Sequence, residues 1–290
     1  MLYSVLTQSL LFFPLTLGIY FSYRILQMTD LTVEGSFVLG AAIFARAISV
    51  SMDPYYALSL AVLGGILSGF FVATLQKKHK ISPLIAGILA LFMLYSINFQ
   101  ILGQPNISLL NQTTLLSQYQ YMAPNVMWGI IAALSIILTF LIYILLKSSY
   151  GYVFRGYGYN ENLVKKLGHS TILYRYVGLA LSNLLAAICG IFTCQVNGYA
   201  DINMGIGMTL TGIGTVVIGV EIVHFFNQKK DEFQPFLELF CCFLGVCLYF
   251  STIYILLRLN ISPVNLKLFI GLILVLFLRM RRSPSSEGVS

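Results

Sequence analysis

The residue types that most often carry chemistry are scattered along this chain and form no catalytic or metal-binding pattern. His79, His169 and His224 lie far apart, and no cysteine or carboxylate stands at ligand spacing beside them. No Gly-x-x-x-x-Gly-Lys-Ser/Thr phosphate loop is present, so we expect no ATP hydrolysis by that route. The cysteines lie within apolar runs, which favours free thiols in packing: Cys189, Cys194, Cys241, Cys242 and Cys247. The sequence therefore predicts no catalysis, no cofactor and no metal.

Polar residues within apolar runs are the next candidates for function. A carboxylate at the centre of a membrane helix costs about 2.5 to 3.5 kcal/mol, and buried amides also need partners there. Such groups line a transport pathway, form hydrogen bonds between helices, or lie near the interface in contact with water. Glu221, close to Lys229 and Lys230, fits the last alternative. The pathway candidates are Glu34, Asn183, Asp201, Asn203 and Glu221.

Membrane helices must position these residues. Hydrophobic residues make up 58% of the 290 residues and charged residues 9%, which is too apolar for a soluble core. A crossing needs about 20 apolar residues, and the first run lacks the basic start and cleavage site of a signal peptide. We therefore expect one all-α, polytopic membrane domain over 1–282. Its expected crossings, about eight or nine, are 2–26, 31–50, 54–76, 81–103, 125–146, 172–196, 207–226, 236–257 and 263–279.

Basic residues lie at alternate ends of these runs. If the basic group at 77–80 is cytoplasmic, fourteen of the seventeen Lys and Arg residues lie on that side. Membrane topology thus explains the net charge of +7, and no nucleic-acid binding is expected. Nine crossings place the N-terminus outside and the C-terminus, with a short polar tail at 283–290, in the cytoplasm. The run 31–50 is either a full crossing or a broken, partly re-entrant helix. The three remaining basic residues are Arg46, Arg258 and Lys267.

Two segments of the chain have a similar build. Residues 30–35 and residues 201–207 each place an aspartate before aliphatic and glycine positions at the expected start of a helix. The predicted topology puts Asp30 on the inner side and Asp201 on the outer side. One interpretation is two halves related by inversion, a plan common in transporters. The other is chance similarity.

The largest basic loop, residues 147–175, contains the pattern of a short helix. Asn160 is suited to cap its start, and Gly168 is a common stop after two turns. Leu163 and Leu167 are four residues apart and share a face, flanked by Asn160 and Val164. The pattern predicts a small apolar surface for a cytoplasmic partner.

A second interpretation of this loop remains open. The same segment could lie on the lipid headgroups as an amphipathic helix, with Lys165 and Lys166 toward phosphate. The two interpretations differ in which face of the helix carries the function.

The loop contains Arg155 and Gly158 ahead of Asn160, Leu163 and Gly168. With this pattern it resembles the coupling segment of permease subunits of bacterial ABC importers, in the branched-chain amino acid permease class. Two further stretches, 30–40 and 178–219, follow in the family's order, and the resemblance extends over roughly residues 5 to 280. It is closest to the subgroup assigned to aromatic or other amino-acid uptake. Gly156 and Val164 replace residues that are usually Ala, and Lys165-Lys166 is unusually basic. The residues that match the coupling pattern are Arg155, Gly158, Asn160, Leu163 and Gly168.

The resemblance implies a transport subunit, not an enzyme, in a bacterial inner membrane. Two permease subunits pair, as a homodimer or a heterodimer, and two cytoplasmic ATP-binding cassette ATPases bind their coupling helices. An external solute-binding protein delivers a small solute, an amino acid being the first expectation. The implied coupling residues are Arg155, Gly158, Asn160, Glu161, Leu163, Leu167 and Gly168.

The residues alone leave rival functions open. In a secondary transporter or channel driven by an ion gradient, intramembrane carboxylates would bind H⁺ or Na⁺, and a neighbouring ATPase gene would decide against it. A membrane enzyme acting on lipid would need a clustered nucleophile or paired acids at the interface, and the sequence shows neither. Amino acids, sugars and nucleosides all suit a pathway of low charge.

Overall fold

The computed structural model describes residues 2–76, 81–117, 119, 124–226, 234–261, 268, 271, 272 and 275. The described chain is almost entirely helical, which confirms the all-α prediction. Its elements are α1 (Leu2–Ile19), the π-helix η1 (Tyr20–Ile25), α2 (Thr32–Ser49), α3 (Pro54–Leu75), α4 (Pro83–Leu102), β1 (Asn106–Ser108), α6 (Pro124–Lys147), α7 (Ser149–Tyr159), α8 (Glu161–Lys166), α9 (Thr171–Asn197), β2 (Tyr199–Asp201), α10 (Met208–Phe226) and α11 (Pro235–Arg258).

Seven of the described helices are long and apolar enough to cross a membrane: α1 with η1, α2, α3, α4, α6, α9 and α11. The apolar helix α10 occupies the expected crossing at 207–226. The structure shows α2 as one uninterrupted helix, so the broken-helix alternative for 31–50 is not observed. Most of the ninth expected crossing, 263–279, lies outside the described residues, as do the basic groups at 77–80, 229–230 and 279–282 and the tail 283–290.

Local sequence sets where these helices begin and end. Proline occupies the first position of α3 and of α4, where the missing N–H costs no hydrogen bond. Asp53 Oδ1 caps α3 by accepting the N–H of Tyr55 at 2.9 Å. At the other end of α4, Gly103 adopts the left-handed conformation, with φ of 71°, that stops a helix.

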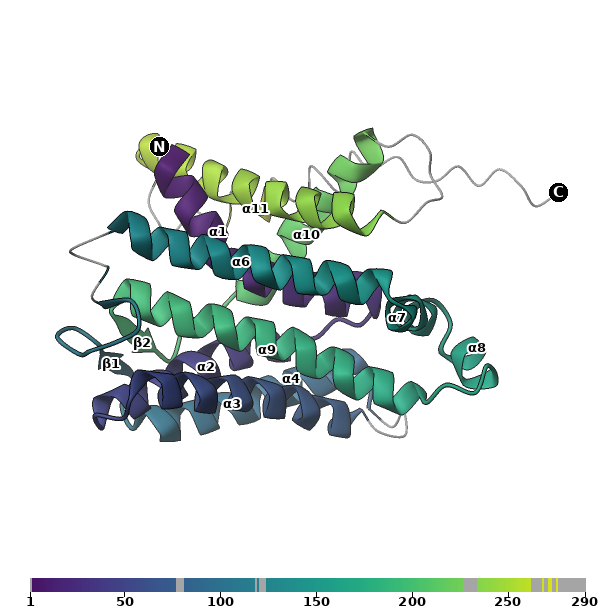
Figure 1. The fold of residues 1–290 in the computed structure, drawn as a ribbon, viewed down its shortest axis with the longest axis horizontal. Coiled ribbons are helices and arrows are strands. Elements are labelled where there is room, and N and C mark those ends of the chain that lie inside the picture. The colour runs from purple at the N-terminus through teal and green to yellow at the C-terminus, as the bar shows by residue number, and fades with distance from the viewer. Residues whose placement is uncertain are drawn as a thin grey trace. The chain divides into compact units, whose positions relative to one another are not determined.

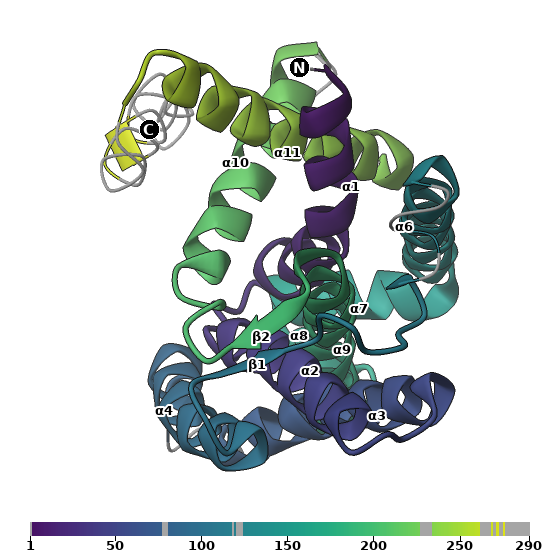
Figure 2. The same cartoon turned by 90° about the vertical axis from the view of Figure 1, so that its left-hand side faces the viewer.

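The chain divides into two compact units, of which residues 10–213 form the larger. Helices α2 and α9 lie at its centre, with α3 and α4 beside them (Figures 1 and 2). Glycines allow the backbones to touch: Gly190 of α9 lies against Phe37 of α2, and Gly69 of α3 lies against Ala180 of α9. Close approach of this kind is typical of membrane helices, whose packing depends on small residues.

Contacts along α9 fix the directions of its neighbours. Gly18 of α1 lies beside Ser182 while Leu11 lies beside Cys189, so α1 runs antiparallel to α9. The starts of α2, α4 and α9 lie at one end of the unit, together with α7 and α8 (Figure 1). At the opposite end, β1 pairs antiparallel with β2, joining Ile107 to Ala200 (Figure 1). Strand β1 lies in the connection between α4 and α6, and β2 follows α9.

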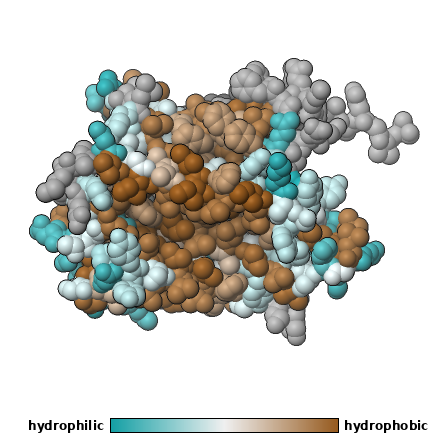
Figure 3. Space-filling model, viewed as in Figure 1, coloured by the Kyte–Doolittle hydropathy of each residue, from teal (hydrophilic) through white to brown (hydrophobic). Residues whose placement is uncertain are grey.

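The outer faces of the larger unit are apolar. Exposed side chains include Leu63 and Leu67 on α3 and Ile136, Ile137 and Phe140 on α6. Figure 3 shows these residue types covering the middle of the helices, with hydrophilic residues gathered near their ends. A helix surface that stays apolar on its solvent side requires lipid around it.

The smaller unit consists of residues 1–9 and 214–290. Its described core is the packing of α10 on α11, where Gly219 lies against the backbones of Cys241 and Cys242, and Gly245 lies against Thr215. The five cysteines are free, as predicted, and four of them are buried.

Candidate functional site

The short helix α8 forms where the sequence predicted it. Asn160 ends α7 and caps α8, with its Oδ1 accepting the N–H of Leu163 at 3.0 Å. Gly168, with φ of 84°, follows the last turn. The helix α7, which precedes it, was not predicted as a separate element. Ser148 caps α7 and starts it directly after α6.

The exposed face of α8 carries two leucines. Leu163 is 50% exposed and Leu167 is 68% exposed, whereas Val164 is only 3% exposed. Val164 turns inward toward Gly156 of α7, so it anchors the helix and leaves the leucines free at the surface. Two apolar side chains are therefore exposed together on a short, capped helix.

Other predicted coupling residues have structural contacts of their own. Gly158 lies against the backbone of Ile25 and Leu26, where any side chain would clash, so it packs α7 onto η1. The guanidinium of Arg155 stacks over the ring of Tyr152, 4.5 Å from its centroid. Both contacts involve α7, the helix that leads into α8.

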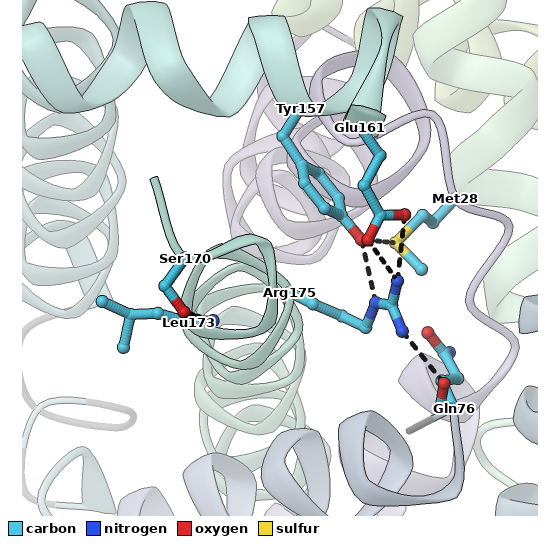
Figure 4. A network of polar contacts seen from close by, with 7 residues as sticks. All are labelled: Met28, Gln76, Tyr157, Glu161, Ser170, Leu173 and Arg175. Carbon is cyan, nitrogen blue, oxygen red and sulfur yellow. Dashed lines mark hydrogen bonds and ion pairs between the residues drawn. The ribbon is translucent and has the colours of Figure 1, made fainter. Parts of the chain in front are cut away.

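The predicted residue Glu161 is joined to a buried arginine that sequence analysis had only counted among the basic residues. Arg175, near the start of α9, is 6% exposed, and its Nη2 donates to both carboxylate oxygens of Glu161 at 3.0 and 3.1 Å. Its Nε donates to Tyr157 Oη at 2.8 Å, and its Nη1 donates to the backbone oxygen of Gln76 at 2.9 Å. Figure 4 shows the guanidinium between these groups. Arg175 thus ties α7, α8 and the end of α3 to α9.

Tyr157 completes this network as a neutral phenol. Burial raises its pKa above the ordinary value, although the hydrogen bond from Arg175 acts in the opposite direction. Its hydroxyl accepts from Arg175 and donates to Met28 Sδ at 4.0 Å. One signal in the sequence could have pointed to the network: a basic residue within an apolar helix requires a nearby carboxylate or several acceptors.

A second polar cluster crosses the centre of the same unit. Asn183 Nδ2 donates to Asp30 Oδ2 at 2.8 Å, and Asn183 Oδ1 accepts from Ser36 Oγ at 2.6 Å. Ser36 in turn bonds Ser68 Oγ at 2.8 Å. All four residues are buried. For the pathway candidate Asn183 this geometry favours the interpretation as an interhelical hydrogen-bonding residue.

Asp30 precedes α2, whereas Glu34 lies in the first turn of that helix. Asp30 Oδ1 accepts the N–H of Thr32 at 2.9 Å. In the same way Asp201 Oδ1 accepts the N–H of Asn203 at 2.7 Å, so both segments of the supposed inverted repeat contain the same turn. The repeat itself stays a prediction.

The pathway candidates Glu34, Asp201 and Asn203 lie on or beside the segment that leads into α10. Glu34 Oε1 accepts the N–H of Thr209 at 3.2 Å, at the first turn of α10, where the helix dipole favours a carboxylate. Residues 202–207 form irregular turns, and Gly205 lies against the backbone of Glu34. Asn203 is exposed there.

The last candidate, Glu221, lies half-buried on α10 in the smaller unit. Among the described residues no group of three His, Cys, Asp or Glu side chains could hold a metal ion.

Comparisons with known proteins agree with this architecture. Residues 1–278 match the family model of the branched-chain amino acid transport system permease component. The chain is 46% identical to the uncharacterized protein RP368 of Rickettsia prowazekii, over 96% of both chains. It is 33% identical to a tyrosine transport system permease protein of Clostridioides difficile, over 95% of this chain and 89% of that one. The permease LsrC of an Escherichia coli autoinducer 2 import system is 28% identical over 54% of this chain and 46% of its own.

No solved structure matches the chain. The family match covers nearly its whole length, and the apolar helices agree with it: this is a multi-pass membrane protein and the transport subunit of an ABC importer. Such a subunit is not an enzyme and works with ATPase and solute-binding partners. By the extent of that match, and by its likeness to the tyrosine permease, the chain belongs to the family of branched-chain amino acid transport system permease components.

Proposed function

We propose that this permease moves an amino acid across a bacterial inner membrane and that α8 is where its ATPase docks. The observation that carries the proposal is the exposed pair Leu163 and Leu167 on a helix that Asn160 caps. An exposed apolar pair on a membrane protein's polar end is best explained by a protein partner. The name of the tyrosine permease supports an amino acid as the solute.

The proposed orientation places α7 and α8 in the cytoplasm. Lys147, Lys165 and Lys166 lie at this end of the larger unit, and basic residues favour the cytoplasmic side. The β1–β2 end would then face outward, toward the binding protein, with the N-terminus outside and the C-terminus inside. We further propose that two permease subunits pair, so that each ATPase receives one α8.

Coupling would be mechanical. An ATPase that closes on ATP moves α8, and the ion pair of Glu161 with Arg175 passes that movement to α9. The pathway would open alternately to the two sides as the helices shift.

The test is the substitution Leu163→Glu in vesicles that contain the permease, its ATPase and its binding protein. A charge on the docking surface should prevent ATPase binding, since burying it there costs several kcal/mol. We expect ATP-driven accumulation of labelled tyrosine to fall to background, while the variant still inserts into the membrane.

The matched control is Lys165→Glu, on the same helix but off the leucine face. It adds more negative charge than Leu163→Glu does, yet uptake should remain near the wild-type level. If Lys165→Glu stops uptake and Leu163→Glu does not, α8 lies on lipid headgroups and the docking assignment is wrong.

A further inference from the structure

A cavity of about 220 Å³ lies directly behind α8. Its walls come from the η1–α2 connection, the end of α3, the start of α4, and α7 to α9, all within the larger unit. Its polar wall includes Gln76, Glu161 and Arg175 together with Gln27 and Tyr157. Its apolar wall includes Leu26, Met28 and Pro83. The Arg175 network therefore forms one side of an open space.

The side chain of Gln76 is left without partners at this cavity. It is 1% exposed, and neither Nε2 nor Oε1 has a hydrogen-bond partner among the described residues. A buried amide with both polar atoms unpaired is costly, and such a group in a native protein calls for an explanation. A ligand that supplies one acceptor and one donor would satisfy both atoms.

The charges beside Gln76 define what that ligand is. Arg175 Nη1 carries a second N–H for which the described residues offer no acceptor, and Glu161 presents a carboxylate that is 29% exposed. Gln76 Nε2 and Arg175 thus form a pair of donors, and Gln76 Oε1 and Glu161 form a pair of acceptors. Both pairs lie next to the apolar wall. This pattern matches a small zwitterion with an apolar side chain.

We propose that this cavity binds a free α-amino acid. The ligand carboxylate accepts from Gln76 Nε2 and Arg175, the ammonium donates to Gln76 Oε1 and Glu161, and the side chain lies against Met28 and Pro83. The site lies apart from the Asp30 and Asn183 cluster at the centre of the unit.

The consequence for transport rests on the proposed function of α8. An occupant would bridge Glu161 of α8, Gln76 after α3 and Arg175 of α9, and would hold these elements together. If α8 must move for each cycle, an amino acid that collects in the cytoplasm and fills this cavity slows import.

Binding can be measured on the purified full-length chain in lipid nanodiscs, without an ATPase. L-leucine is the probe, and leucinamide, without the carboxylate, and 4-methylpentanoate, without the ammonium, are its matched analogues. We expect calorimetry to give a dissociation constant of about 1 mM or tighter for leucine and affinities at least about tenfold weaker for each analogue.

The decisive variant is Gln76→Leu, which removes both unpaired atoms at similar volume and should therefore fold well. Leucine affinity should fall about tenfold or more. Gln195→Leu is the control, because Gln195 is an equally buried amide on α9 that does not line the cavity. The Gln195→Leu variant should bind leucine as tightly as the wild type does.

The proposal is overturned if leucine does not bind, or if Gln76→Leu binds it as well as Gln195→Leu does. The latter result would place the leucine elsewhere in the chain, for example in the transport pathway. Leu163→Glu should keep full leucine binding, because Leu163 does not line the cavity. A failure of the docking assignment and a failure of this site therefore give different results.

Discussion

Arg175 holds more of the predicted coupling segment together than any residue that the family pattern pointed to. Its guanidinium donates to Tyr157, Glu161 and the backbone of Gln76, so a single buried cation joins three separate elements to α9. Arginine suits this role because its planar fork offers five N–H groups in fixed directions. Glu161, one of the implied coupling residues, is the carboxylate that this cation holds.

Substitution of the arginine tests that interpretation. Arg175→Gln removes the cation from Glu161 and removes hydrogen bonds to two further acceptors, and should destabilise the protein by about 3 kcal/mol. Arg155→Gln, at the half-exposed arginine that stacks on Tyr152, should cost about 1 kcal/mol or less. Thermal unfolding in detergent measures both. Equal losses at the two positions would contradict the central role of Arg175.

Asp30 should make stability depend on pH. Burial raises its pKa above the ordinary value, despite the hydrogen bonds from Thr32 and Asn183. The folded state therefore keeps the proton to a higher pH than the unfolded state does. The stabilisation is complete below the unfolded pKa, about 4, and is lost as pH rises toward the folded pKa.

Asp30→Asn removes this dependence because the side chain stays neutral. Melting temperatures of the two proteins, measured from about pH 4 to about pH 8, should differ in slope: the wild type loses stability relative to the variant as pH increases. A loss of hydrogen bonding would shift the whole curve of the variant without changing its slope. Parallel curves would show that Asp30 ionises as freely as in the unfolded chain.

At the scale of elements, glycines set the distances between helices. Gly190 touches the backbone of Phe37, and the space there would not admit even one methyl group. Gly129 on α6 has nothing within 4 Å of where a side chain would begin. The two glycines have the same helical conformation and opposite surroundings.

Alanine at each position separates packing from helix propensity. Gly190→Ala should destabilise the protein by about 1 to 3 kcal/mol, because α2 and α9 must move apart. Gly129→Ala should leave stability unchanged or raise it by about 0.5 to 1 kcal/mol, the gain expected for alanine over glycine within a helix. Thermal unfolding of both variants is the measurement, and a destabilised Gly129→Ala would mean that its face is covered.

The sequence predicted long elements well and short ones poorly. Hydropathy alone located α1 to α4, α6, α9, α10 and α11, because lipid demands about 20 apolar residues for each crossing. It could not indicate that Tyr20–Ile25 forms a π-helix or that β1 pairs with β2, since both depend on neighbours distant in sequence. Asn160 and Gly168 were predictable as a cap and a stop because their roles are local. Arg175 donates to a backbone oxygen 99 positions away, a contact that no local pattern reveals.

At the scale of the whole molecule, the membrane topology can be tested by labelling introduced cysteines. The native cysteines give a low background, because Cys189, Cys194, Cys241 and Cys242 are buried. Leu167→Cys, at the α8 end, and Leu110→Cys, beside β1, introduce exposed thiols at opposite ends of the larger unit.

A membrane-impermeant maleimide added to intact cells should label Leu110→Cys and leave Leu167→Cys unmodified. Labelling of inverted membrane vesicles should give the reverse result. If both thiols react from the same side, the two ends of the larger unit do not lie on opposite sides of the membrane. If Leu167→Cys reacts on intact cells, the proposed orientation is inverted.

Helix α9 is secured at each of its ends, by Arg175 where it begins and by the β1–β2 pair just beyond Gly198. Its 27 residues make a rod about 40 Å long. Close backbone contacts pack it against α2 and α3 between these two ends. A pull on α8 would then tilt the whole rod, with the strand pair as its pivot.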